Sequence, residues 1–254
     1  MTLHYKLIGT GNPIIILHGL FGMGDNLFTF GKMLEALHNT VYLVDLRNHG
    51  RSPHSSEHNY KVMSEDVVQL IKGEHLHQPI VFGHSMGGKV AMQLAIDYPY
   101  LVAKIIIVDI TPFYYAPHHY KIIDALKSID LHGLNTRKEA EQQLMNALND
   151  AGTVQFLLKS LYRKEDNLFA WRFNLDALAS NRNETGRETT VNAPCLTPAL
   201  FIKGERSDYI REASFNDIKK VFPHAVLKVV AGAGHWVHAD NPQGLTEAVA
   251  DFLL

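Results

Sequence analysis

The chain contains a single cysteine, Cys195, so no disulfide bond can form within it. Disulfides are rare in reducing compartments, and this scarcity agrees with an intracellular protein. Unpaired cysteines are usually buried and behave as small hydrophobic residues. We therefore expect Cys195 to have a packing role and no chemical one.

The sequence also lacks an excess of charge of either sign. It has 24 Lys and Arg residues against 26 Asp and Glu residues, a formal net charge of -2. Binding to nucleic acid or to an anionic membrane surface would require a basic stripe or a strongly basic domain. We therefore expect neither nucleic acid nor a membrane among the partners of this protein.

No long apolar run is present. None approaches the ~20 consecutive apolar residues of a transmembrane helix. The first residues, MTLHYKLIGTGNP, lack the basic stretch and long apolar segment that form a secretion signal. We therefore expect a cytoplasmic protein, and its 46% hydrophobic content is sufficient for a well-filled globular core.

The sequence does contain a regular alternation of short apolar runs and amphipathic runs. Such alternation is typical of a parallel sheet with crossover helices, and continuously apolar strands indicate that helices cover both faces of the sheet. The predicted strands cover 13–19, 40–46, 79–85 and 102–110, and the predicted helices cover 25–38, 61–75 and 85–97.

The alternation stops after Pro112. From about 118 to 184 the periodicity predicts only helices, over 120–129, 138–150, 154–162 and 169–181. Strand-like runs return at 196–205 and 225–234, each followed by a helical stretch. We interpret this pattern as an α/β core that a helical segment interrupts, and we predict a first core part at 1–111, a helical cap at 112–190 and a second core part at 191–254.

The most informative short segment is GHSMGG, residues 83–88, at a predicted strand-to-helix junction. A serine on such a sharp turn presents its hydroxyl at the end of the sheet, which makes Ser85 a candidate nucleophile. Side chains two residues before and after it would collide, which explains Gly83 and Gly87. Gly88 would let the following helix approach the strand closely.

A second glycine-rich segment, HGLFG at 18–22, follows the first predicted strand. A main-chain amide from such a loop can bind the oxygen of a tetrahedral intermediate together with the amide of the residue after the nucleophile. We predict Leu20 and Met86 as these two donors, with Phe21 as the alternative to Leu20. His18 is also a possible base, but a histidine beside a glycine turn is more typical of a structural hydrogen bond.

His235 is the preferred candidate for the general base. It lies in the glycine-rich segment AGAGHWVHADNP, directly after the last predicted strand. A neutral imidazole there can take the hydroxyl proton near neutral pH and return it to the leaving group. We expect His238, one helical turn farther on, to be a surface or packing residue.

Two carboxylates are candidates for the acid that orients the imidazole. Asp109 lies at the end of the strand next to that of the nucleophile, and Asp208 follows the strand after it. Both strand ends can reach an imidazole at the same edge of the sheet. The spacing of these residues therefore leaves both assignments open.

Several of these segments together resemble the α/β-hydrolase superfamily, in particular the small YbfF-type bacterial esterases, relatives of the mitochondrial abhydrolase-domain proteins. The resemblance is carried by HGLFG, DLRNHGRS, GHSMGG, VDITP, FNLDAL and GAGHWVHADNPQ, in that order. It implies an α/β-hydrolase fold that lacks about one initial strand and has a four-helix cap inserted after the sixth strand of the family. It also implies hydrolysis of small esters or thioesters without a cofactor, and it favours Asp109 over Asp208 as the acid.

These features predict a serine hydrolase, namely a carboxylesterase that acts on small acyl esters, or on acyl thioesters such as acyl-CoA, through an acyl-enzyme on Ser85. Five aromatic residues are candidates either for lining an acyl pocket or, equally, for packing the cap against the core: Phe113, Tyr114, Tyr115, Phe169 and Trp171. The basic residues available at the rim of such a pocket are Lys121, Lys127 and Arg172, although any solvated face also carries basic residues. The same triad would also serve a carbon–carbon bond hydrolase or a cofactor-free perhydrolase. A non-catalytic ligand receptor and a metal hydrolase using His75 and His77 are weaker alternatives, and we expect no metal.

Overall fold

The computed structural model describes residues 1–116, 119–191 and 193–254. A mostly parallel sheet of seven strands forms its centre, in the order β1–β3–β2–β4–β5–β8–β9. Only β1 runs antiparallel to its neighbour within this sheet. The strands are β1 (Tyr5–Ile8), β2 (Asn12–Leu17), β3 (Asn39–Val44), β4 (Ile80–His84), β5 (Lys104–Val108), β8 (Ala199–Gly204) and β9 (Ala225–Val230).

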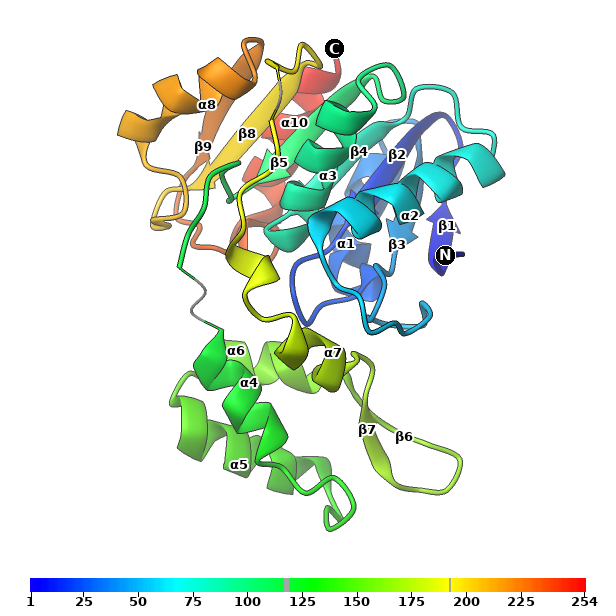
Figure 1. Ribbon diagram of the computed structural model, residues 1–254, viewed down its shortest axis with the longest axis vertical. Coiled ribbons are helices and arrows are strands. Elements are labelled where there is room, and N and C mark those ends of the chain that lie inside the picture. The colour runs from blue at the N-terminus through cyan, green and yellow to red at the C-terminus, as the bar shows by residue number, and fades with distance from the viewer. Residues whose placement is uncertain (117–118, 192) are drawn as a thin grey trace.

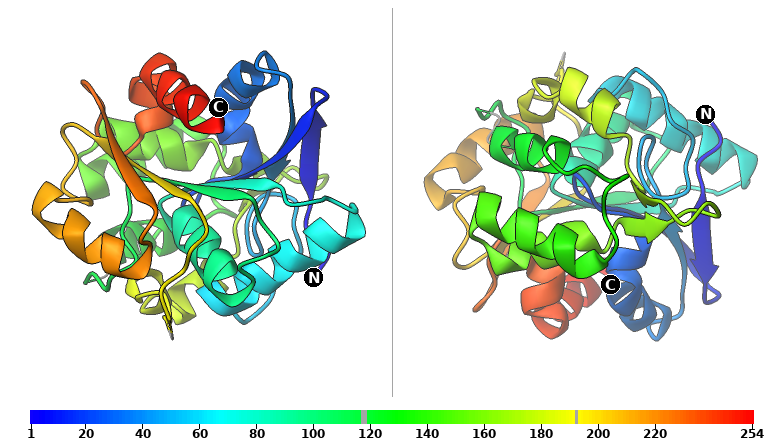
Figure 2. Two further views of the ribbon diagram at one scale, coloured as in Figure 1. Left: turned by 90° about the horizontal axis from the view of Figure 1, so that it is seen from above. Right: turned by 90° about the horizontal axis from the view of Figure 1, so that it is seen from below.

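Helices cover both faces of this sheet, as the apolar strands predict (Figure 2). One face carries α1 (Phe28–Glu35) and α10 (Pro242–Leu253), and the other carries α2 (Tyr60–Gly73), α3 (Met86–Asp97) and α8 (Phe215–Val221). The central strands are fully buried, as in β2, where residues 14–17 have no exposed surface. The predicted fold class, an α/β-hydrolase fold, is confirmed.

The segment between β5 and β8 lies at the carboxyl ends of the central strands, below the sheet in Figure 1. It contains four α-helices within the described residues, which agrees with the predicted helical insertion. This segment, the insertion, follows β5, the fifth strand of the chain. Its elements are α4 (Tyr120–Lys127), α5 (Arg137–Leu148), α6 (Ala151–Leu158), β6 (Leu161–Arg163), β7 (Phe169–Trp171) and α7 (Leu175–Ser180).

The hairpin of β6 and β7 corrects the sequence prediction, which made both of these stretches helical. The antiparallel pair joins Leu161 to Trp171 and Arg163 to Phe169. The turn between them is closed by main-chain hydrogen bonds between Lys164 and Leu168 and between Asn167 and Lys164, with Asn167 in the left-handed region at φ 66°. Strands of three residues are too short to show the two-residue alternation from which a strand is predicted. Residue 118, the first of the predicted helical stretch, lies outside the described residues.

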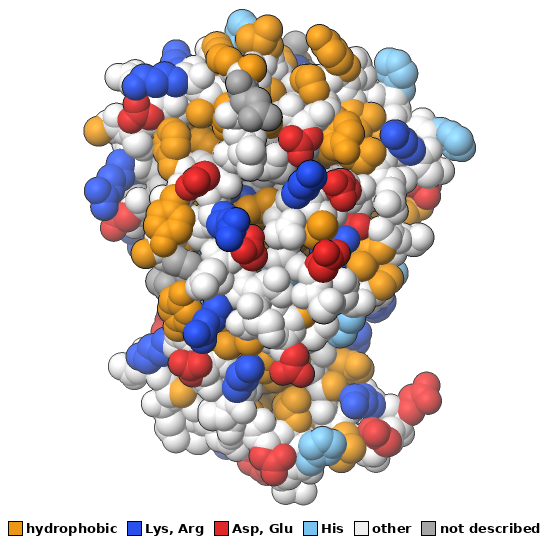
Figure 3. All heavy atoms as spheres, in the orientation of Figure 1, with side chains coloured by type: hydrophobic (Ala, Val, Ile, Leu, Met, Phe, Trp, Pro, Cys, Tyr) orange, Lys and Arg blue, Asp and Glu red, His pale blue; other side chains and the backbone are white. Residues whose placement is uncertain are grey.

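Shorter helices complete the chain: the 3-10 helices η1 (Gly24–Leu27), η2 (Glu184–Gly186) and η3 (Glu212–Ser214), and the single turn α9 (Val237–Asp240). No helix in the described part of the chain is long and apolar enough to span a bilayer. Acidic and basic side chains are interspersed over the face shown in Figure 3, in keeping with the small net charge.

Candidate active site

Ser85 occupies the turn between β4 and α3 in a strained backbone conformation, φ 52° and ψ -115°. A positive φ at a residue other than glycine is uncommon, and such strain is concentrated at functional sites. The serine amide donates to the carbonyl of Val108 on the neighbouring strand at 3.0 Å, which fixes the turn to the sheet. The side chain is nearly buried, with 8% of the residue exposed.

The glycines around Ser85 meet the steric demand that the sequence predicts. A Cβ atom on Gly83 would lie 2.2 Å from the carbonyl oxygen of Gly87, and one on Gly87 would lie 2.4 Å from that of Leu17. A Cβ on Gly88 would lie 2.7 Å from a methyl group of Ile110. The close approach of β4, α3 and the loop after β2 therefore requires glycine at these positions.

The structure brings Ser85, His235 and Asp109 together in one hydrogen-bonded line. The Oγ of Ser85 lies 3.1 Å from Nε2 of His235, and Nδ1 of His235 lies 2.7 Å from Oδ2 of Asp109. Asp109 is fully buried at the end of β5, and the imidazole side chain is about a quarter exposed. Such a carboxylate holds the proton on Nδ1 and leaves Nε2 free to accept the serine proton.

Two further donors hold the Asp109 carboxylate. The amide of Gly204 donates to Oδ1 at 3.2 Å, and the hydroxyl of Ser207 makes a short hydrogen bond to Oδ2. The sequence analysis did not identify Ser207, although it lies in the same segment, GERSD, as the alternative acid. Both contacts fix the carboxylate in the orientation that faces His235.

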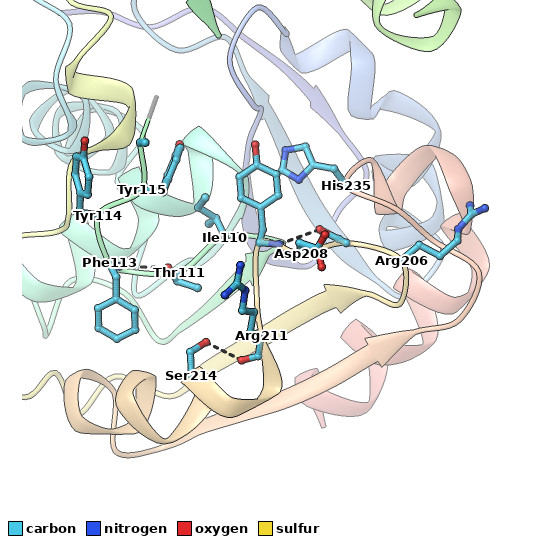
Figure 4. A pocket seen from close by; sticks show the side chains of 13 residues that line it. Ile110, Thr111, Phe113, Tyr114, Tyr115, Arg206, Asp208, Arg211, Ser214 and His235 are labelled. Carbon is cyan, nitrogen blue, oxygen red and sulfur yellow. Dashed lines mark hydrogen bonds between the residues drawn. The ribbon is translucent and has the colours of Figure 1, made fainter. Parts of the chain in front are cut away.

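Asp208, the alternative acid, lies elsewhere. Its side chain is exposed and lines a cavity beside the site (Figure 4). No hydrogen bond or ion pair joins Asp208 to His235 within the described residues. The chain reverses direction after β8, so that Ser207 points inward to Asp109 while Asp208 points to solvent.

The two predicted amide donors flank Ser85. Met86 is the first residue of α3, and the amides of a helix's first turn have no acceptor within the helix. Leu20 lies in the loop after β2, where a Cβ on the preceding residue, Gly19, would be 3.4 Å from Cβ of Ser85. The amide of Phe21, the alternative donor, instead points to Nε2 of His49 at 3.2 Å. This geometry favours Leu20 over Phe21.

His84 and Tyr209 position the His235 side chain and main chain, and the sequence analysis identified neither. Nε2 of His84 lies 2.8 Å from the carbonyl oxygen of His235. The Tyr209 ring stacks on the His235 imidazole, with ring centroids 4.1 Å apart and 22° between the planes. Burial lowers the pKa of His84 well below its usual value, so this residue is a neutral hydrogen-bond donor to the His235 carbonyl.

His18 and His49 have structural roles at the loop after β2. The ring nitrogens of His18 lie 2.8 Å from the Gly19 carbonyl and 3.0 Å from the Leu46 amide, so neither faces Ser85. Burial lowers the pKa of His18 to about 4 and that of His49 to about 3. Both rings are therefore neutral in the folded protein and act as fixed hydrogen-bonding groups. His238, expected at the surface or in packing, contacts the ring of His84 edge-on.

A cavity of about 650 Å³ opens beside His235 (Figure 4). Tyr114, Tyr115 and Phe113 from the start of the insertion line one side, as the sequence predicts, and residues from the loop after β8 line the other. Arg206 and Arg211 supply its positive charge, and the sequence analysis did not identify either. Figure 4 shows the Arg211 side chain lying between Thr111 and Asp208, whereas Arg206 points away from them.

The other predicted pocket residues do not line this cavity. Phe169 and Trp171 are buried inside the insertion, where the Trp171 ring stacks on Phe173. The guanidinium of Arg172 lies over the Tyr162 ring at 4.4 Å. Phe169 and Trp171 therefore have the packing role of the two alternatives, because the β6–β7 hairpin turns both side chains into the core of the insertion.

His75 and His77, the pair considered as metal ligands, are exposed after the end of α2. In residues 1–116, 119–191 and 193–254, no three His, Cys, Asp or Glu side chains lie close enough together to hold a metal ion.

Comparison with known proteins identifies the family. A family model described as alpha/beta hydrolase fold matches residues 12–242. The chain is 38% identical over 264 residues to the sn-1-specific diacylglycerol lipase ABHD11 of Mus musculus, covering 100% of this chain and 85% of that protein. It is 36% identical over 243 residues to Esterase YbfF of Escherichia coli (strain K12), covering 95% of this chain and 93% of that protein. The solved structure of a marine microorganism esterase matches with a TM-score of 0.96 and 42% identity over 99% of both chains. The chain therefore belongs to the α/β-hydrolase family, with YbfF-type esterases and ABHD11 proteins among its relatives.

Proposed function

We propose that this protein is a serine carboxylesterase that hydrolyses small acyl esters through an acyl-enzyme on Ser85. The observation that carries the proposal is the hydrogen-bonded line from Asp109 through His235 to Ser85, at 2.7 Å and 3.1 Å. The relatives named an esterase and a lipase support the same class of reaction. Residues 112–190 would act as a cap over the site.

In the acylation half-reaction, the Ser85 hydroxyl attacks the ester carbonyl while Nε2 of His235 takes its proton. The Asp109 carboxylate stabilises the resulting imidazolium through the proton on Nδ1. The amides of Leu20 and Met86 donate to the oxyanion of the tetrahedral intermediate. His235 then gives its proton to the leaving alcohol, and the acyl group stays on Ser85.

Deacylation repeats these steps with water. Nε2 of His235 accepts a proton from a water molecule, and the oxygen of that water attacks the acyl carbonyl. The carboxylic acid leaves, and the proton on His235 returns to the Ser85 oxygen. The positive end of α3, which begins at Met86, favours the negative charge that develops at the carbonyl oxygen in both halves.

The cavity beside His235 would hold the part of a substrate that extends past the imidazole, since His235 lines it whereas Ser85, Leu20 and Met86 do not. Its volume of about 650 Å³ and its aromatic wall of Phe113, Tyr114 and Tyr115 suit an apolar group with a few polar contacts. An acyl thioester such as acyl-CoA would react by the same steps. No observation favours the carbon–carbon bond hydrolase or the perhydrolase over the esterase.

The test is hydrolysis of a panel of p-nitrophenyl esters from acetate to decanoate. We expect the wild type to release p-nitrophenol with saturation kinetics, and Ser85→Ala to lose at least about a thousandfold of this activity. Ser56→Ala is a matched control, because it makes the same change at an exposed serine outside the candidate site. Wild-type activity that survives Ser85→Ala would refute the proposal, as would activity on diketones but not on esters.

A further inference from the structure

A wholly buried lysine lies beside the candidate site without a role in the mechanism above. Lys89, on α3, has no exposed surface. A buried ammonium group is costly unless hydrogen bonds satisfy it. Nζ of Lys89 donates to the carbonyl of Phe113 at 2.6 Å and to that of Arg187 at 2.7 Å.

These two carbonyls belong to the two segments that connect the insertion to the core, residues 111–116 and 185–189, which we call the neck. The segments are joined to each other: the Tyr115 amide donates to the Gly186 carbonyl at 3.0 Å, and the Thr189 amide donates to the Pro112 carbonyl at 2.9 Å. Lys89 therefore contacts both segments of the neck at once and ties them to the helix that begins beside Ser85.

Two tyrosine hydroxyls also bind the second segment of the neck. The hydroxyls of Tyr60 and Tyr115 both donate to the carbonyl of Thr185, at 2.5 Å and 2.7 Å. Nζ of Lys89 lies 5.3 Å from the centre of the Tyr115 ring and 5.9 Å from that of Tyr60, within the range of cation–π attraction. Within the described residues, Lys89 has no carboxylate at ion-pair distance, so main-chain carbonyls and aromatic rings provide its surroundings.

The charge of the amine does not decide whether this attachment forms. Burial lowers the pKa of Lys89 to about 7, against the opposing effect of the Glu188 charge. The neutral amine still carries two N–H donors. The two neck carbonyls can therefore be satisfied in either protonation state.

The neck forms a wall of the candidate substrate cavity. Thr111, Phe113, Tyr114, Tyr115 and Ala116 all line the cavity beside His235. The Tyr115 ring also contacts that of Tyr209 edge-on, with centroids 5.9 Å apart, and Tyr209 stacks on His235. A shift of the neck would therefore move this wall.

We propose that Lys89 is a positioning residue that fixes both segments of the neck to α3 and thereby sets the shape of the cavity in which an ester substrate binds. This role rests on the proposed esterase function. An apolar residue could fill the volume of Lys89, but it would leave two partly buried carbonyls without their donor. Lys89 acts on the substrate through the wall of the cavity and takes no part in the chemical steps.

The test compares Lys89→Met with Lys104→Met. Lys104 is a matched control, because its Nζ also donates to two main-chain carbonyls, those of Phe252 and Leu253, at the other end of the molecule. We expect Lys89→Met to raise amide hydrogen exchange about tenfold in 111–116 and 185–189, with no change in β2 and β4. Lys104→Met should leave exchange in the neck unchanged.

Kinetics supply a second readout. For p-nitrophenyl octanoate, we expect Lys89→Met to raise KM about tenfold with kcat changed less than about twofold, and for the acetate ester we expect both constants to stay near wild type. Loss of a merely structural contact would lower the fraction of active protein and reduce kcat for both esters alike. If Lys89→Met does not fold, Lys89→Gln, which keeps N–H donors, should show smaller changes in the same direction.

Two results would overturn the inference. One is amide hydrogen exchange in the neck that is equal in Lys89→Met and the wild type. The other is a ratio of KM for the octanoate ester to KM for the acetate ester that is the same in both proteins. The exchange measurement needs no catalytic activity, so it tests the attachment even if the protein hydrolyses no ester. If the wild type hydrolyses no ester but amide exchange in the neck still rises in Lys89→Met, the proposed function is refuted and the attachment of the neck by Lys89 is supported.

Discussion

The Asp109 carboxylate illustrates how individual residues define this site. It receives hydrogen bonds from the Gly204 amide and the Ser207 hydroxyl on one side and faces Nδ1 of His235 on the other. Two groups from the end of β8 and the turn after it, together with His235 from the loop after β9, thus fix one carboxylate without exposing it to solvent. This arrangement supports Asp109 as the acid of the proposed triad.

A pair of substitutions tests this assignment. We expect Asp109→Asn to lower kcat by about 10⁴, because the imidazole then adopts the wrong tautomer. Asp208→Asn should change kcat by less than about twofold, since exposed side chains away from the reacting atoms have small effects. Steady-state kinetics on one ester, with circular dichroism to verify folding, measures both. A large loss in Asp208→Asn with little loss in Asp109→Asn would contradict the assignment.

Sequence reasoning could not choose between these two carboxylates, and the reason is geometric. Asp109 and Asp208 follow β5 and β8, which are neighbours in the sheet, so both main-chain positions lie near the same edge. The difference lies in the loop after β8, which turns Ser207 inward and Asp208 outward. Which of these two adjacent loop residues points inward depends on the course of the loop, and an irregular loop has no periodic sequence pattern from which to predict it.

Among the elements, the β4–α3 junction depends most on residue size. The predicted crowding around Gly83 and Gly87 follows from the sharpness of the turn that a nucleophilic serine requires. The main-chain oxygen atoms 2.2 Å and 2.4 Å from the added Cβ positions cannot move without displacing β2 or α3. This part of the fold could therefore be predicted from a short motif alone.

We predict that Gly83→Ala lowers the free energy of unfolding by about 3 kcal/mol, because its Cβ would overlap the main chain of Gly87. Gly73→Ala is a matched control in α2, since no atom lies within 4 Å of its added Cβ. It should stabilise the protein by about 0.5 kcal/mol through the lower conformational entropy of the unfolded chain. Urea denaturation measures both, and equal stability of the two variants would contradict the steric account.

Short elements without periodicity escaped prediction. Strand β1 was not expected, because its residues 5–8 are only partly buried and exposed side chains weaken the apolar signal. Strands β6 and β7 span three residues each and lie beside helices, so their aromatic residues continue the helical pattern. The six strands predicted as β2, β3, β4, β5, β8 and β9 are longer, all but β9 are mostly buried, and all six are confirmed.

At the scale of the whole molecule, buried histidines link stability to pH. Burial lowers the pKa of His18 and His238 to about 4 and that of His49 and His58 to about 3. Their usual pKa in an unfolded chain is 6.5. Below that pH the unfolded chain binds protons that the folded protein does not, so stability falls as pH decreases from about 6.5.

We predict that the free energy of unfolding falls between pH 6.5 and 4.5, by about 1.4 kcal/mol per pH unit for each such histidine. Both ring nitrogens of His58 are buried and have no hydrogen-bond partner in the described part of the chain, which makes it the most suitable histidine to replace. His58→Leu should reduce this slope by about 1.4 kcal/mol per pH unit, the contribution of one histidine. Urea denaturation at several pH values measures the slope, and a flat profile in the wild type would contradict this account.

Of the predictions that concern the whole chain, the fold class is the one that the structure tests. The alternation of apolar and amphipathic runs follows from the burial of parallel strands on both faces, and it predicted the fold class that the sheet and the family comparison confirm. Lys89 shows the limit of such patterns, because a lysine in an amphipathic helix predicts a solvent-exposed side chain. The cytoplasmic location and the division at 112–190 stay predictions.

Capture of the nucleophile by a fluorophosphonate tests the central claim most directly. Intact-mass spectrometry of the folded protein should show one added phosphonyl group, and peptide mapping should find it on Ser85. Ser85→Ala should take up no label, and Asp109→Asn should react much more slowly than the wild type. Failure of folded wild-type protein to react, or a label on any residue other than Ser85, would contradict the account.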